Sequence, residues 1–204
     1  IGMVFTRGQQ IRVISQLLRQ AKLKDLIMPN MPPMIPVGKG KGFKGATVLS
    51  PITNFYNKHP ISTLDFASLY PSIMIAHNLC YTTFIEPKNV KKYNPEDYTR
   101  SPSGHCFVKP HIAKGLLPEI LKGLLGARKI AKKDLKLAKN KIRKAVLNGR
   151  QLALKVSANS VYGFTGAMRG ALPCLEISSS VTSFGRIMID DTKKWVESTY
   201  SKKN

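Results

Sequence analysis

The stretch Asp65-Phe66-Ala67-Ser68-Leu69-Tyr70-Pro71-Ser72-Ile73 decides the expected fold, because it joins a strand pattern directly to a helix pattern. Residues 60–66 alternate between two faces, so a strand is predicted there. Proline is tolerated in the first turn of a helix, so Pro71 predicts a helix over residues 72–79, after a turn at 67–70. Asp65 is thereby placed at the end of a strand and beside the beginning of a helix.

Asp65 and the turn that follows it form a candidate ligand site. The peptide N–H groups of Ser68, Leu69 and Tyr70 would point at whatever Asp65 holds, and helix N-termini favour phosphate. A carboxylate beside such donors suits a Mg²⁺ ion that bridges the protein and a triphosphate. The alternative is that Asp65 only caps the helix, and the turn by itself does not decide between the two.

The rest of the chain is predicted to be mostly helical. Apolar residues recur at helical spacing over 7–21, 116–144, 150–164 and 178–199, with Asn148-Gly149 as a break. The second of these patterns predicts a helix that is whole or broken once, and with the third it predicts two antiparallel helices. In the last helix the side chains expected to face mostly inward are those of Val181, Phe184, Ile187, Met188 and Trp195.

Outside the helices the pattern predicts a short strand at residues 47–49. Residues 93–111 are expected to be irregular, with a turn at 101–104 before a short strand. The segment 29–45 holds four Pro and four Gly and is predicted to be a mobile basic loop. It lacks the GxxxxGK[ST] pattern of a Walker-type phosphate loop.

Length and charge limit the classes of function. The 204 residues, 43% of them hydrophobic, suffice for one or two compact domains. No apolar run approaches the ~18 residues of a membrane span, so an integral membrane protein is not expected. Lys and Arg number 33 against 11 Asp and Glu, and the net charge of +22 indicates a polyanionic partner, with nucleic acid ahead of an anionic membrane. The three cysteines form neither a zinc cluster nor a disulfide framework, which fits a reducing compartment, cytosol or nucleus.

Half of the net charge lies on residues 122–155, which carry twelve Lys or Arg and a single acid. A solvated surface is the simplest interpretation of most of these residues. Arg128, however, lies on an apolar stripe and needs an anionic partner there, unless it reaches past its neighbours to water. Lys155, Asn159 and Tyr162 share one face of a helix beside a packing face. This face is predicted to bind a phosphate ligand, with an ordinary polar helix face as the alternative.

Two of these stretches resemble motifs of family B DNA polymerases. Residues 65–73 resemble motif A, and Lys155-Val156-Ser157-Ala158-Asn159-Ser160-Val161-Tyr162-Gly163 resembles motif B, in the correct order. Within the family, the chain is most similar to the delta-type branch over nearly all of its 204 residues. Herpesvirus-type polymerases share much of motif A and are the nearest competitor. The stretches that carry the delta-type resemblance are Arg7–Gln10, Ala76–Thr83, Lys114–Pro118, Gly163–Ala167 and Leu172–Ser178.

The resemblance implies roles for the motif A residues. Asp65 would be the catalytic residue and bind both metal ions, with the carbonyl group of Phe66 as a further metal ligand. Ser68 and Leu69 would offer backbone N–H groups to the triphosphate. Tyr70 would pack under the sugar and exclude a 2′-hydroxyl group by steric conflict.

The resemblance also implies roles for the basic helices. Arg128, Lys155 and Asn159 would hold the triphosphate of the incoming nucleotide. Tyr162 and Gly163 would border the nascent base pair and the templating base.

A fold, an activity and partners follow from the same resemblance. The fold would be α+β, with a polymerase palm sheet and packed helices (1–113 and 165–204) interrupted by an antiparallel two-helix fingers hairpin (114–164). The activity would be template-directed addition of deoxynucleoside triphosphates to a primer 3′ end by two-metal-ion nucleotidyl transfer with Mg²⁺. The partners would be a DNA primer–template, accessory subunits and a sliding clamp, in the nucleus.

The resemblance is incomplete, because motif C, an Asp-Thr-Asp hairpin in family B, does not occur in these 204 residues. A two-metal site cannot rest on Asp65 alone. The sequence is therefore expected to be a palm–fingers excerpt without exonuclease or thumb, inactive by itself. The alternative class is a non-catalytic, basic nucleic-acid-binding module, which the charge favours equally. The joint presence of Asp65, Tyr70, Lys155 and Asn159 favours the polymerase, because a simple binder has no need of them.

Overall fold

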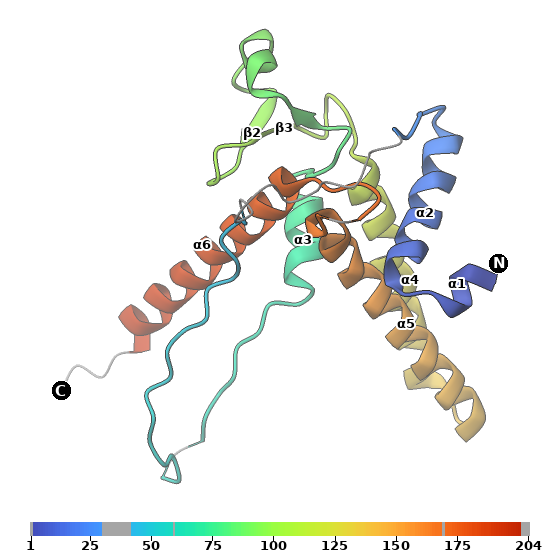
Figure 1. Ribbon diagram of the computed structural model, residues 1–204. Coiled ribbons are helices and arrows are strands. Elements are labelled where there is room, and N and C mark those ends of the chain that lie inside the picture. The colour runs from blue at the N-terminus through green and yellow to red at the C-terminus, as the bar shows by residue number, and fades with distance from the viewer. Residues whose placement is uncertain (1, 30–41, 59, 169, 201–204) are drawn as a thin grey trace.

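The described part of the chain is an α+β arrangement dominated by helices (Figure 1). The computed structural model describes residues 2–29, 42–58, 60–168 and 170–200. Within them, three short strands form one antiparallel sheet in the order β1-β3-β2. This agrees with the expected α+β class. In chain order the elements are α1 (Gly2–Thr6), α2 (Gln9–Leu23), α3 (Leu69–Ala76), β1 (Phe84–Ile85), the 3₁₀-helix η1 (Pro87–Lys92), β2 (Tyr98–Arg100), β3 (Cys106–Val108), α4 (Leu116–Leu137), α5 (Lys141–Gly166) and α6 (Leu175–Tyr200).

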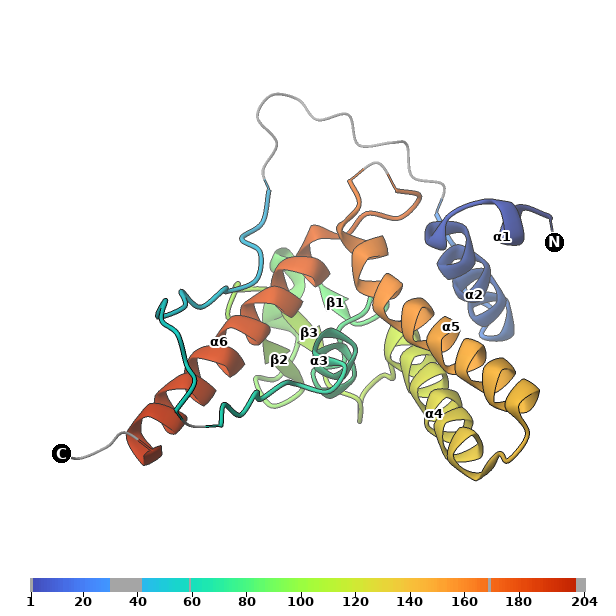
Figure 2. The ribbon, with the colours of Figure 1, turned by 90° about the horizontal axis from the view of Figure 1, so that it is seen from below.

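The core lies where α3 meets α4, α5 and α6. Figure 2 shows α4 and α5 side by side, with α2 along this pair and α3 between the pair and α6. Each of the helices α2 to α6 contributes at least one core side chain that is at most 2% exposed: Leu17, Met74, Leu121, Val161 and Val181. Burying one such side chain contributes about 1.5–3 kcal/mol. One common core therefore positions all the helices that carry the candidate site.

Asn78 ties the end of α3 to the sheet and to the beginning of α4. Its side chain is buried, and its backbone is left-handed (φ 53°), a conformation that asparagine tolerates better than most residues. Its Nδ2 donates to the carbonyl groups of Val108 (2.7 Å) and Ala113 (2.8 Å), and its Oδ1 accepts from the N–H group of Gly115 (2.9 Å). A single buried side chain thus fixes where α4 begins relative to α3.

The connection between α4 and α5 lies at residues 138–140. Asn140 caps α5, because its Oδ1 accepts from the N–H groups of Ile142 (2.8 Å) and Arg143 (3.3 Å). The helix predicted over 116–144 is therefore broken once, which is one of the two predicted forms. The break predicted at 148–149 is wrong, since α5 continues through Gly149. A glycine inside a helix costs only about 1 kcal/mol relative to alanine, which packing against α4 easily offsets.

The strands predicted at 47–49 and 60–66 are wrong. Both segments lack regular secondary structure, and their apolar side chains are exposed, with Val48 at 88% and Leu64 at 70%. A strand is stable only beside a neighbour, and no segment of the described chain pairs with these two. The alternating pattern of side chains predicted two strands, but such a pattern does not show whether a neighbouring strand is present.

Helix α6 begins earlier than predicted, and its second half leaves the core (Figure 1). Val181 is buried, and Phe184 and Met188 are partly buried, as expected. The prediction is wrong for Ile187 and Trp195, which are 45% and 56% exposed. The elements packed on α6, chiefly α3 and α5, lie along its first half, which accounts for the exposure of Trp195.

The remaining expectations concern loops and short elements. The turn at 101–104 is confirmed, with the N–H group of Gly104 donating to the carbonyl of Ser101 (2.9 Å), and strand β3 follows it. Most of the basic loop predicted at 29–45 lies outside the described residues, and residues 42–45 have no regular secondary structure. No helix of the described residues is long and apolar enough to cross a membrane.

Candidate active site

A cavity of about 640 Å³ lies between the N-terminus of α3 and the facing sides of α4 and α5. It brings together nine of the ten residues that the sequence singled out, although they come from three separate segments. The segment that leads into α3 contributes residues 65–71, and the two long helices contribute Arg128, Lys132, Lys155, Asn159 and Tyr162. The two motif-like stretches therefore form a single site.

The first turn of α3 presents free backbone donors to this cavity. Ser68 is left-handed (φ 53°), which turns the chain sharply between the extended segment and the helix. The first backbone bond of the helix runs from the N–H group of Ser72 to the carbonyl of Ser68 (2.9 Å). The N–H groups of Ser68, Leu69 and Tyr70 have no acceptor among the described residues, as the first N–H groups of a helix normally do not. Such donors at the positive end of a helix suit an anion.

The opposite wall of the cavity is cationic. Arg128 is half-buried and donates from Nε to Oε1 of Gln151 (3.4 Å), while Lys132 and Lys155 are exposed. None of these three cations takes part in an ion pair of the described residues. Arg128 thus lines the cavity without a carboxylate partner among the described residues, so its charge is available to an anionic ligand.

The three side chains that were predicted to share one face of α5 do share it. Ala158 and Val161 are buried against the core, and Lys155, Asn159 and Tyr162 turn to the cavity. One helical turn separates Lys155 from Asn159, so a cation and an amide can reach the same phosphate chain.

Tyr70 and Tyr162 close the cavity from α3 and α5. Their ring centroids are 4.5 Å apart, and a Cβ at Gly185 of α6 would lie 3.5 Å from Cε1 of Tyr70. Burial raises the pKa of Tyr162 to about 12, and the neighbouring Tyr70 adds to the shift. The phenol of Tyr162 therefore stays protonated at neutral pH and offers a hydrogen bond without a charge.

Asp65 is the single carboxylate that lines the cavity, and it is exposed and forms no ion pair among the described residues. A carboxylate oxygen with a neighbouring main-chain carbonyl, that of Phe66, fits the oxygen ligands that Mg²⁺ prefers. The described residues contain no cluster of three or more His, Cys, Asp or Glu side chains. The described residues therefore fit part of a magnesium site and do not complete one.

Lys132 was not singled out from the sequence, although it lines the cavity, and Gly163 was expected at the site but does not line the cavity. Lys132 lies one turn after Arg128 on α4 and lines the same cavity, and its spacing of four residues from Arg128 is the signal that could have identified it. Gly163 is exposed and is not among the lining residues.

Comparison with known proteins assigns the chain to a family. The sequence profile of DNA polymerase family B matches residues 1–204, the whole chain. The chain belongs to DNA polymerase family B. Its family B relatives include the DNA polymerase delta catalytic subunits of Arabidopsis thaliana (60% identical over 98% of this chain), Oryza sativa subsp. japonica (59% over 98%) and Mesocricetus auratus (54% over 100%). The chain spans 18% of the length of each of these relatives.

A solved family B structure has the same fold. The family B DNA polymerase from the archaeon Pyrobaculum calidifontis superimposes with a TM-score of 0.73 over 97% of this chain and 25% of its own length, at 30% identity. The resemblance to family B is thus confirmed by sequence relatives and by fold, and the resemblance to delta-type enzymes is confirmed by the sequence relatives.

Proposed function

We propose that the protein is the palm–fingers part of a replicative, delta-type DNA polymerase catalytic subunit. Its reaction is the template-directed addition of deoxynucleoside triphosphates to the 3′ end of a DNA primer. In this proposal residues 1–113 and 165–204 belong to the palm, and residues 114–164, with α4 and α5, are the fingers hairpin.

The observation that carries the proposal is the shared cavity. A carboxylate, a set of free helix N-terminal donors and three cations surround one space that is large enough for a nucleotide. Nucleotidyl transfer depends mainly on positioning and on neutralising phosphate charge, so this set of groups fits the reaction. A protein that only bound DNA would need the cations but not Asp65 or Tyr70.

The proposed residue roles are those that the resemblance to family B implies, and the common cavity supports them. The backbone N–H groups of Ser68 and Leu69 and the side chains of Arg128, Lys132, Lys155 and Asn159 hold the triphosphate from its two sides. Tyr70 lies under the sugar, where a 2′-hydroxyl group would collide with its ring. Tyr162, with Gly163 next to it in the chain, borders the base pair.

Asp65 and the carbonyl of Phe66 hold Mg²⁺ in this proposal. Bound Mg²⁺ supplies neutralisation of the charge that develops on the phosphates during transfer. Because the described residues offer a single carboxylate at the cavity, the second acidic ligand comes from a part of the enzyme outside them. The proposed partners are a DNA primer–template, accessory subunits and a sliding clamp, and the proposed location is the nucleus.

The test is primer extension by the full-length protein with and without the Asp65→Asn substitution. The wild-type protein should extend a labelled primer when Mg²⁺ and deoxynucleotides are present, and Asp65→Asn should abolish extension. Asp134→Asn is the matched control, because it removes the same charge from α4 at a position that does not line the cavity.

DNA binding, measured in parallel at fixed salt, separates the two classes of function. A wild-type protein that bound primer–template but never extended it would be a non-catalytic binding module. Equal extension by wild type and Asp65→Asn would remove Asp65 from the reaction.

A further inference from the structure

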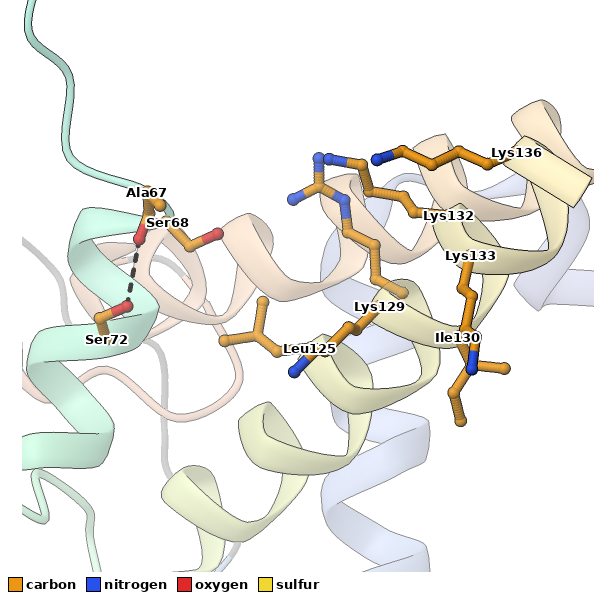
Figure 3. Close-up of a pocket in the computed structure, with 10 residues that line it drawn as sticks. Ala67, Ser68, Ser72, Leu125, Lys129, Ile130, Lys132, Lys133 and Lys136 are labelled. Atoms are coloured by element: carbon orange, nitrogen blue, oxygen red, sulfur yellow. Dashed lines mark hydrogen bonds between the residues drawn. The ribbon is translucent and has the colours of Figure 1, made fainter.

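A second hollow, of about 660 Å³, adjoins the nucleotide cavity along α4. The two share Ala67, Ser68, Arg128 and Lys132 in their linings, so they meet at these residues. Lys136 lines only the second hollow. Figure 3 shows this hollow between the first turn of α3 and the lysine-rich side of α4.

Arg128, Lys132 and Lys136 form a row of cations at four-residue steps on one side of α4. Long side chains on a helix lean toward its N-terminus, so the end of each side chain lies over the preceding turn. In Figure 3 the ammonium groups of Lys132 and Lys136 extend to the same side, toward the region of Ser68, whereas Lys133 extends away from them. The row therefore leads from the nucleotide cavity to the outer hollow.

No acid lines the outer hollow, and the row is not neutralised by the described residues. None of the ion pairs in the described chain includes Arg128, Lys132 or Lys136. Like charges at four-residue spacing repel one another, so an anion that touched two of them would relieve the repulsion. Lys136 also lies in the last turn of α4, where a cation is favoured by the helix dipole. The dipole accounts for a basic residue at this place, and the lean of helical side chains toward the N-terminus directs its ammonium group along the row.

We propose that Lys136 is the outer contact of an oligophosphate path, along which pyrophosphate leaves the cavity. This inference rests on the proposed function and extends it. Nucleotide addition forms a bond between the primer O3′ and the α-phosphorus, and the proton of the 3′-hydroxyl group passes to water. The bond from the α-phosphorus to the bridging oxygen breaks, and this oxygen departs with pyrophosphate. The triphosphate of an arriving nucleotide has the same chemistry, so the test separates the two.

The experiment uses the full-length protein and inorganic pyrophosphate as the probe. Single-nucleotide incorporation is measured at increasing pyrophosphate for the wild type, Lys136→Ala, Lys136→Glu and Lys136→Arg. We expect Lys136→Ala to raise the inhibition constant of pyrophosphate about threefold, as for loss of a partly exposed charge contact, and Lys136→Glu to raise it further. Lys136→Arg should restore the wild-type constant. Lys122→Ala is the control, because it removes an exposed lysine of the same helix that lines neither hollow.

Each outcome decides a separate point. A changed pyrophosphate constant assigns the path to the leaving product, and a matching rise in the nucleotide KM extends it to the arriving triphosphate. Unchanged constants for Lys136→Glu, or the same shift in Lys122→Ala, would overturn the path while leaving the proposed function intact. A wild-type protein that incorporated no nucleotide would overturn the proposed function itself, and with it the path.

Discussion

The ring of Tyr70 packs against the ring of Tyr162, with centroids 4.5 Å apart and planes inclined by 43°. One ring belongs to the first turn of α3 and the other to the face of α5 that bears Lys155 and Asn159. This contact joins the two walls of the cavity directly. Because the contact holds the ring of Tyr70, the ring can act as a rigid steric barrier to a sugar.

We therefore expect Tyr70→Ala to weaken discrimination against ribonucleotides. Removing the ring opens space for a 2′-hydroxyl group, and steric selection of this size corresponds to a factor of about 10–200. The measurement is the ratio of kcat/KM for deoxynucleotide and ribonucleotide in the full-length protein. Tyr162→Phe keeps the ring contact and serves as the control. If Tyr70→Ala discriminated as well as the wild type, the ring would not lie under the sugar.

The helices were the predictable part of the fold. Leu117 and Leu121 of α4, and Ala158 and Val161 of α5, are buried as their spacing requires. Helical spacing is a local property, so it can be read from one segment. The cap that Asn140 forms on α5 is also a local feature. The helix break was nevertheless predicted at Gly149, because glycine disfavours a helix in isolation. Tertiary packing overrides that preference.

The strands and the layout of the site depended on partners elsewhere in the chain. Alternation at 60–66 could not reveal that no described segment pairs with it. Helical spacing grouped Lys155 with Asn159, but only the resemblance to family B linked them to Asp65. Lys132 was not singled out among similar lysines, although its spacing of four residues from Arg128 places it on the same side of the helix.

Lys155 should matter to nucleotide use far more than a neighbouring exposed lysine. Lys155→Ala removes a charge-assisted phosphate contact worth about 1.5–3 kcal/mol, so kcat/KM for the incoming nucleotide should fall about 10- to 150-fold. Lys144→Ala, on the same helix and exposed, lines neither hollow and should cost little. DNA affinity should barely change for Lys155→Ala. If Lys155→Ala weakened DNA binding and left kcat/KM for the nucleotide unchanged, this face would be a general basic surface.

Binding of DNA by the 204-residue chain should depend steeply on salt. The net charge of +22 releases counterions from phosphates, without preference for sequence. We expect the affinity for a fluorescent single-stranded oligonucleotide to fall at least about tenfold between roughly 50 and 200 mM salt. An affinity that stayed flat over this range would mean that the lysines of α4 and α5 do not face DNA.

The stability of the protein should decrease on acidification through His77. The His77 ring stacks on Phe184 with centroids 3.7 Å apart, and burial lowers its pKa below the ordinary 6.5. The unfolded chain therefore binds the proton first, so this part of the stability is complete above pH 6.5 and is lost as pH falls through the lower folded-state pKa. His77→Phe keeps a stacked ring without titration. Thermal unfolding at several pH values should show a smaller acid-induced loss in His77→Phe than in the wild type, and equal losses would contradict the assignment.

Gly115 should not tolerate alanine. A Cβ there would lie 2.8 Å from Cβ of Cys80 and 2.9 Å from Oδ1 of Asn78, so Gly115→Ala should destabilise the protein by about 1–3 kcal/mol. Gly123→Ala is the matched control within α4, because a Cβ there meets nothing within 4 Å. That substitution should instead stabilise the helix by about 0.5–1 kcal/mol. Denaturant titration of both variants measures the difference, and a Gly115→Ala protein as stable as the wild type would contradict the close contact.

The close packing at Gly115 also lies directly before α4, so it bears on the direction in which the helix starts. Arg128 lies thirteen residues from Gly115, or about 20 Å along a helix that rises about 1.5 Å per residue. A tilt of α4 by about 5° at Gly115 would displace the guanidinium group of Arg128 by roughly 1.5–2 Å. A displacement of this size is enough to break a hydrogen bond to a phosphate. A methyl group at Gly115, outside the cavity, would therefore change nucleotide affinity by displacing Arg128. The residues around Asn78 thus help to position the cations of the cavity.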